Sequence, residues 1–185
     1  TSGSGSLLIT IGKSVAKYTK SKDDIMYYAQ ELKENTYNLT RMNLVMRGIK
    51  PDNIFTRCGD TLEQDWPMYD DVTQEYNPLY LDAVVSNPPY YAPGSGKDGG
   101  PARMEREELD TLCRAAARLL RNGGRFALSF PTQRMVELFE TMRRWDLEPK
   151  RLKLLSHTPT KPPYALLAEG VRQGRPGLQV LPCLE

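Results

Sequence analysis

The sequence predicts an α/β protein with a mostly parallel β-sheet and helices on both faces of that sheet. Three observations support this fold class. Segments with helical periodicity alternate with short apolar runs along the chain. The length of 185 residues suits one domain and is enough for a hydrophobic core. A hydrophobic content of 39% and a charged content of 26% are ordinary for a soluble globular protein.

Two helices are predicted in the first half of the chain. Residues 6–21 and residues 35–48 both place apolar side chains at helical spacing, and Gly48 can end the second helix. The first apolar stripe consists of Leu7, Leu8, Ile11 and Val15. The second consists of Tyr37, Leu39, Met42, Val45 and Met46.

Three strands are predicted around these helices. The first, within residues 24–32, ends near Glu31, and the second, residues 53–60, ends at Asp60. A polar loop over residues 61–80 leads to the third strand, residues 81–86. Each strand therefore ends beside a polar residue, since Asn87 directly follows the third.

The second half repeats this alternation. A helix is predicted around residues 109–120, ended by Gly123 and Gly124, and is followed by a strand over 125–130. Apolar spacing from Met135 to Met142 predicts another helix. Residues 151–156 and 164–171 are predicted to be the last two strands, an antiparallel pair joined by a proline-rich turn.

Composition excludes several function classes. No segment approaches the roughly 18 apolar residues of a membrane span, and the N-terminus lacks a signal peptide, so we expect a cytoplasmic protein. The three cysteines favour reduced thiols over a disulfide framework. Without a CxxC pair a zinc site is not expected, and His157 is the one histidine on which a catalytic triad could depend. A net charge of +2 permits a nucleic-acid partner without requiring one.

Ligands of parallel sheets bind beyond the carboxyl ends of the strands, and several polar features fall there. Gly3 and Gly5 precede a helix whose N-terminus could hold a carboxylate or a phosphate. Glu31 could accept hydrogen bonds from ribose hydroxyls, and Asp60 from an adenine amino group. The alternatives are a linker for the glycines and solvated loop acids for the carboxylates.

The most specific motif is Asn87-Pro88-Pro89-Tyr90. The Asn87 side-chain oxygen and the Pro88 carbonyl could each accept one N–H of an aromatic amine and aim its lone pair at an electrophile. Two prolines fix the backbone, and Tyr90 could stack on the ring. A rigid turn after a strand is the alternative interpretation.

The sequence around this motif resembles S-adenosylmethionine-dependent methyltransferases that modify adenine at N6. Residues 1 to about 90 resemble the modification subunit of type I restriction-modification systems, through TSGSGSLLITIGK, YYAQELKENTYNLTRMNLVMRGI, GDTL and DAVVSNPPY. Residues 87–185 resemble the tRNA adenine-N6 methyltransferases that act on valine tRNA, through NPPYY, AARLLRNGGRFAL, EPKRLKLLSH and LLAEGVRQGRPGLQVLP.

The resemblance implies a class I, Rossmann-like methyltransferase fold, S-adenosylmethionine as cofactor and a role for each candidate residue. The cofactor residues would be Gly3, Ser4 and Gly5 at its methionine part, Glu31 at the ribose, Asp60 at the adenine, and Asn87. The catalytic residues would be Asn87, Pro88, Pro89 and Tyr90. The implied partners are nucleic acid and, for a restriction-type enzyme, a specificity subunit.

Two expectations follow from comparison with the family pattern. Because the sequence starts within the glycine-rich loop, we expect a single methyltransferase domain over 1–185 that lacks the first central strand of its sheet. The two resemblances meet at 87–91, which we interpret as a junction of two homologous halves.

The substrate stays open between DNA, slightly preferred, and tRNA, and an inactive fragment or weak nucleic-acid-binding module is a further alternative. A basic cluster could meet phosphates or be a solvated face; it consists of Arg143, Arg144, Lys150, Arg151 and Lys153.

Overall fold

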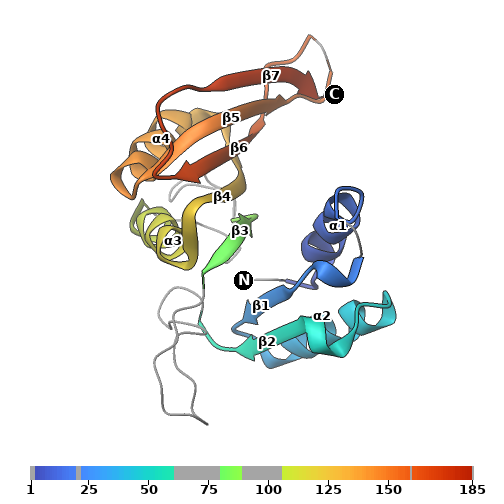
Figure 1. Ribbon diagram of the computed structural model, residues 1–185. Helices are drawn as coiled ribbons and strands as arrows, with labels where there is room; N and C mark the ends of the chain where they lie inside the picture. The colour runs from blue at the N-terminus through green and yellow to red at the C-terminus, as the bar shows by residue number, and fades with distance from the viewer. Residues whose placement is uncertain (1–2, 20–21, 61–79, 89–105, 159, 185) are drawn as a thin grey trace. The chain divides into compact units, whose positions relative to one another are not determined.

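The computed structural model describes residues 3–19, 22–60, 80–88, 106–158 and 160–184. The chain divides into two compact units, Thr1–Trp66 and Pro67–Glu185. Figure 1 shows their elements, coloured by position in the chain. Each unit has its own sheet and its own helices.

The first unit contains a two-stranded parallel sheet. Strand β1 (Tyr27–Glu31) pairs with β2 (Ile54–Cys58), so that both strands end at the same edge. The two predicted strands are therefore confirmed, although the second ends at Cys58 and not at Asp60. Short 3-10 turns at Lys22–Asp24 and Pro51–Asn53 precede the two strands.

Two helices accompany this sheet, as predicted. Helix α2 (Glu34–Met46) connects β1 to β2 and contacts both, which is the crossover that parallel strands require. Gly48 follows its end with a φ of 76°. Helix α1 (Ser6–Val15) contacts α2.

The apolar stripe predicted for α2 is not the buried face of this helix, so that prediction is wrong. Its fully buried positions are Thr40 and Leu44, four residues apart, whereas Met42 is 53% and Met46 75% exposed. A polar residue, Thr40, therefore occupies the face of the helix that meets the rest of the unit.

The second unit contains a five-stranded mixed sheet in the order β3-β4-β6-β5-β7. Its strands are β3 (Leu81–Ser86), β4 (Leu120–Pro131), β5 (Leu147–Leu155), β6 (Ala165–Arg172) and β7 (Gln179–Leu184). The predicted antiparallel pair, β5 and β6, is confirmed, and β4 also runs antiparallel to β6. The parallel pairs are β3 with β4 and β5 with β7.

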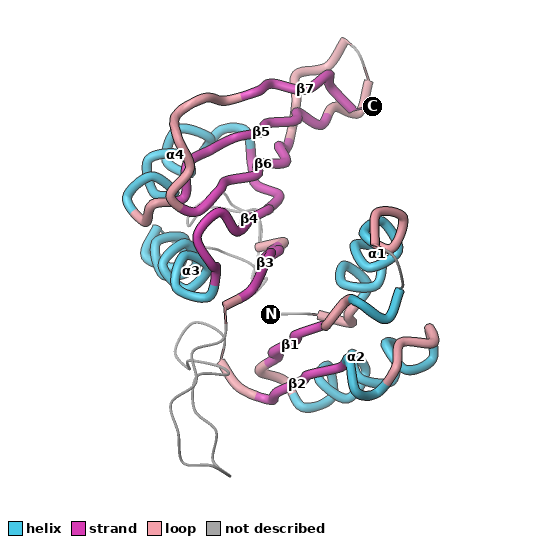
Figure 2. The backbone as a smooth tube through the Cα atoms, viewed as in Figure 1, coloured by secondary structure: helices cyan, strands magenta, loops and turns pink. Residues whose placement is uncertain are grey.

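Helices α3 (Arg106–Leu119) and α4 (Met135–Arg144) contact each other and pack on this sheet through β3, β4 and β5 (Figure 2). A short 3-10 turn, Thr132–Arg134, leads from β4 into α4. The core between helices and sheet includes Leu109, Cys113, Leu120, Phe126, Phe130, Leu138, Met142 and Leu166. The helical spacings of residues 109–120 and 135–142 thus identify the buried faces, except that Val136, which belongs to the second apolar stripe, is 67% exposed.

Two sequence expectations fail in the second unit. The glycine pair does not end α3; the helix ends at Leu119, and Gly123 and Gly124 lie within β4, Gly123 with a φ of 79°. Residues 164–171 are not the last strand, because β7 follows and pairs with β5. The residues of β7 are mostly exposed and alternate only weakly between apolar and polar, so the sequence of this strand carries little periodic signal.

The sequence predicts a sheet that lacks a central strand. Among the residues that the structure describes, β1 pairs only with β2 and β3 only with β4, in two different sheets. Within the same described ranges, no helix is long and apolar enough to cross a membrane.

Gly12 provides a test of the packing of α1. A Cβ at this position would lie 2.1 Å from the Tyr27 hydroxyl oxygen and 2.7 Å from a ring carbon. Alanine normally stabilises a helix by about 1 kcal/mol relative to glycine. Here we expect Gly12→Ala to lower the free energy of unfolding by about 1–3 kcal/mol, because the added methyl group overpacks the contact. Urea unfolding followed by circular dichroism measures the change.

The matched control is Ser14→Ala, at an exposed position of the same helix. It should leave stability unchanged or slightly raised. An equal gain in both variants would contradict the close approach of α1 to Tyr27.

The three cysteines should differ in reactivity. Cys113 is fully buried, and burial raises the pKa of its thiol to about 12, whereas Cys58 and Cys183 are exposed. Since the thiolate is the reactive form, we expect a disulfide reagent such as DTNB at pH 8 to label only the two exposed thiols until urea is added. A Cys58→Ser/Cys183→Ser variant should show no rapid labelling; prompt reaction of its remaining thiol would argue against the core position.

Candidate active site

The glycine turn, residues 3–5, leads into α1 and requires glycine at two positions. Gly3 has a φ of 56° and Gly5 a φ of 78°, in the left-handed region that other residues rarely adopt. Gly5 is the N-cap of α1, and its carbonyl accepts the first helical hydrogen bond from the Ile9 amide at 3.1 Å. The amide groups of the first turn of α1 lack helical acceptors, as at any helix start, and no acidic side chain of that turn competes with an external anion for them.

The structure brings the glycine turn and Glu31 together. The Gly3 amide donates to Glu31 Oε2 at 2.9 Å. Glu31 is the last residue of β1 and is 7% exposed. A buried carboxylate is costly without such a partner, so this contact fixes both groups.

Asp60 lies at the same end of the first unit's sheet. The Gly59 amide donates to the Glu31 carbonyl at 3.1 Å, and the Gln30 side-chain amide donates to the Asp60 carbonyl at 3.3 Å. The predicted gathering of polar groups at one sheet edge is therefore present within this unit for the glycine turn, Glu31 and Asp60.

Two residues of α2 that sequence reasoning missed also contact the glycine turn. Thr40 Oγ1 donates to the Gly3 carbonyl at 2.5 Å, and Asn43 Nδ2 donates to the Ser4 carbonyl at 2.9 Å. The Ser4 hydroxyl is paired with that of Ser6 at 2.8 Å. No pattern in the sequence marks either residue, because Thr40 shares a helix face with buried Leu44 only once the orientation of α2 is known.

Asn87 and Pro88 follow β3 in the second unit. Asn87 is exposed and Pro88 is buried. The Ser129 hydroxyl, on the neighbouring strand β4, donates a hydrogen bond to Asn87 Oδ1. Ser129 was also missed, because its proximity comes from the pairing of Ser86 with Leu128 and not from sequence distance. Pro89 and Tyr90 lie outside the described residues.

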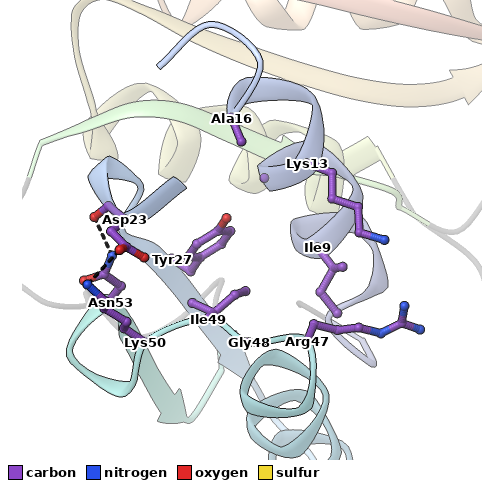
Figure 3. Close-up of a pocket in the computed structure, with 11 residues that line it drawn as sticks. Ile9, Lys13, Ala16, Asp23, Tyr27, Arg47, Gly48, Ile49, Lys50 and Asn53 are labelled. Atoms are coloured by element: carbon purple, nitrogen blue, oxygen red, sulfur yellow. Dashed lines mark hydrogen bonds and ion pairs between the residues drawn. The ribbon is translucent and has the colours of Figure 1, made fainter. Parts of the chain in front are cut away.

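A cavity of about 240 Å³ in the first unit lies elsewhere (Figure 3). It is lined by Ile9, Gly12, Lys13, Ala16, Asp23, Tyr27, Arg47, Gly48, Ile49, Lys50 and Asn53. Tyr27 begins β1 and Glu31 ends it, so the cavity lies at the opposite end of the strand from the glycine turn. At this cavity Lys50 Nζ lies 2.7 Å from Asp23 Oδ2, and the hydrogen bond between them raises the pKa of Lys50. None of the predicted site residues lines this cavity.

Most of the basic cluster is engaged within the chain. Its ion pairs are Arg143–Glu148, Arg144–Asp110 and Arg151–Glu169, and Lys150 donates to the Arg175 carbonyl. These contacts favour the interpretation as an internally paired surface. His157 is exposed and stacks on Tyr164 with ring centroids 4.2 Å apart. In the part of the chain that the structure describes, no three His, Cys, Asp or Glu residues are grouped as metal ligands.

Comparison with known proteins assigns the family. Residues 1–101, which include the glycine turn, Glu31, Asp60 and the Asn87–Tyr90 motif, match the N-6 DNA methylase family. The chain belongs to this family. The resemblance to type I modification subunits is confirmed by a curated member, the methylase subunit of the type I restriction enzyme MpnII from Mycoplasma pneumoniae. It is 38% identical over 89 residues, which are 48% of this chain and 16% of that protein. The chain thus matches only a small part of this relative.

Solved structures confirm the class I methyltransferase fold. The type I restriction-modification methyltransferase subunit from Streptococcus thermophilus superposes with a TM-score of 0.66 at 23% identity, over 98% of this chain and 41% of that one. A class I S-adenosylmethionine-dependent methyltransferase candidate from Listeria monocytogenes gives a TM-score of 0.69 at 13% identity, over 100% of this chain and 56% of that one. At these identities the similarity is one of fold.

Proposed function

We propose that this chain transfers the methyl group of S-adenosylmethionine to the exocyclic N6 amine of adenine in DNA. Membership of the N-6 DNA methylase family carries the proposal, because the matched residues include both the candidate cofactor turn and the Asn87–Tyr90 motif. The similarity to a type I methylase subunit supports DNA over tRNA and suggests a specificity subunit as partner. We further propose that the chain acts as one methyltransferase domain in the cytoplasm.

The first unit would bind the cofactor. The glycine turn and the first turn of α1 supply amide donors for the carboxylate of the methionine part. Glu31 would accept hydrogen bonds from the ribose hydroxyls; a carboxylate has about four lone-pair sites, so the Gly3 contact leaves capacity. Asp60, whose backbone is held by Gln30, would accept from the adenine amino group of the cofactor.

The bound cofactor would supply an electrophilic methyl group on a sulfonium. Asn87 Oδ1 and the Pro88 carbonyl would accept the two N–H bonds of the target amine, so that the nitrogen becomes more nearly tetrahedral and its lone pair becomes available to an electrophile. The N–C bond would form as the sulfonium S–C bond breaks, which would leave S-adenosylhomocysteine, and a proton would then leave the nitrogen to solvent. The target adenine must leave its stack to reach these groups.

Ser129 would orient Asn87 in this reaction. Its hydroxyl donates to Asn87 Oδ1, which fixes the amide so that the oxygen is the acceptor end. A carbonyl oxygen has two lone pairs, so in the proposed reaction the same oxygen would accept from both the Ser129 hydroxyl and the adenine amine. The Pro88 ring, buried after β3, fixes the backbone next to this oxygen.

Cofactor binding can be measured directly. A ligand present at 100 times its dissociation constant stabilises the folded state by about 2.7 kcal/mol, which raises the melting temperature by several degrees. We expect this shift with S-adenosylmethionine or S-adenosylhomocysteine, and a smaller one for Glu31→Ala. A melting temperature that does not change at millimolar cofactor would refute the proposed cofactor site.

Methyl transfer tests the catalytic assignment. Tritiated methyl groups should be incorporated into the N6 position of adenine in unmethylated duplex DNA, and not into unmodified tRNA. Asn87→Ala should lower the rate by about 100-fold, because the amine loses a positioning acceptor. Asn122→Ala, at an exposed position of the same unit, is the matched control. Labelling of tRNA alone would assign the substrate to RNA, and equal rates for both variants would remove Asn87 from the mechanism.

A further inference from the structure

Thr40 and Asn43 hold two successive carbonyl groups of the glycine turn. Thr40 is 1% exposed, and its hydroxyl lies 2.5 Å from the Gly3 carbonyl and 3.0 Å from the Thr36 carbonyl of its own helix. A hydroxyl has one proton to donate, and the shorter distance favours Gly3. Asn43, three residues further along α2, donates to the Ser4 carbonyl at 2.9 Å.

The Thr40 methyl group makes a third contact with the turn. A Cβ at Gly5 would lie 3.1 Å from Thr40 Cγ2, so the methyl group packs directly against Gly5. Thr40 thus meets the turn at both of its glycines. This contact leaves little room for a residue larger than glycine at position 5. The positive φ of Gly5 is a second reason for glycine there.

The direction of these carbonyls determines the direction of the amides. In a planar trans peptide the C=O and the following N–H point in opposite directions. The Gly3 carbonyl faces Thr40, so the Ser4 N–H points away from α2. The Ser4 carbonyl faces Asn43, so the Gly5 N–H points away as well. The N–H groups of Ser4 and Gly5 therefore both point away from α2, and adjacent backbone N–H groups that point the same way can bind an anion.

We propose that Thr40 and Asn43 are positioning residues for the cofactor, which act by orienting the Ser4 and Gly5 amides toward the carboxylate of its methionine part. This inference rests on the proposed function. Neither residue touches the cofactor in this scheme. Their loss should therefore weaken the affinity for ligands that carry the amino-acid carboxylate and spare ligands that lack it.

The test compares two ligands on the full chain. S-adenosylhomocysteine contains the carboxylate, whereas adenosine contains only the ribose and adenine assigned to Glu31 and Asp60. Dissociation constants for both are measured by calorimetry or NMR titration. We expect Thr40→Val and Asn43→Ala each to weaken the binding of S-adenosylhomocysteine by about 3- to 10-fold, which is the effect of one lost hydrogen bond. The affinity for adenosine should not change.

Two further variants serve as controls. Thr40→Ser keeps the hydroxyl and should retain most of the affinity, and it also tests the role if Thr40→Val does not fold. Asn38→Ala, at an exposed position of α2, should have no effect on either ligand.

The outcomes separate the possible failures. An equal loss of affinity for both ligands would mean that Thr40 and Asn43 have a general structural role, and it would overturn the inference. Unchanged S-adenosylhomocysteine affinity in both Thr40→Val and Asn43→Ala would overturn it as well. If the unaltered chain binds neither ligand, the proposed function fails first, and this inference fails with it.

Discussion

The hydrogen bond from the Gly3 amide to Glu31 connects the start of α1 to the end of β1. These residues are 28 positions apart, and the contact exists because α1 and the following turn return the chain to the strand that ends at Glu31. A carboxylate that is 7% exposed requires a donor, and the Gly3 amide supplies it. The same contact ties the glycine turn to the end of β1, and the candidate cofactor residues of the first unit are arranged around it.

Helix α2 also contacts the glycine turn, through two of its side chains. It connects the two strands whose ends carry Glu31 and Asp60, so its position is fixed by the crossover. The helix presents Thr40 and Asn43 to the turn and leaves Met42 and Met46 exposed. Its orientation thus places hydrogen-bonding side chains inward where an apolar stripe would be expected, which is reasonable for a helix that supports a backbone turn.

In the second unit, the position of Asn87 depends on the pairing of β3 with β4. That pairing brings Ser129 to the Asn87 side chain and sets the amide for its proposed task. The core beneath, built from α3, α4 and the sheet, includes fully buried Phe126 and Phe130 on β4, the strand that carries Ser129. The orienting group therefore lies on a rigid element, which suits a residue whose role is to position another.

The sequence by itself determined the order of most helices and strands, because apolar periodicity and chain connectivity are local properties. It also located Gly3, Glu31, Asp60 and Asn87 at strand ends or before a helix, and the family match covers all of them. It did not identify β7, the end of α3 or the buried face of α2. Those depend on which surfaces meet, and residue spacing does not encode that.

Only the tertiary structure decided which side chains support the candidate site. Thr40 and Asn43 reach the glycine turn across 37 and 39 positions of sequence, and Ser129 reaches Asn87 across 42. As single polar residues on a helix or a strand they have no distinguishing pattern. Their roles arise from strand register and helix rotation, which are set by the packing of the whole unit.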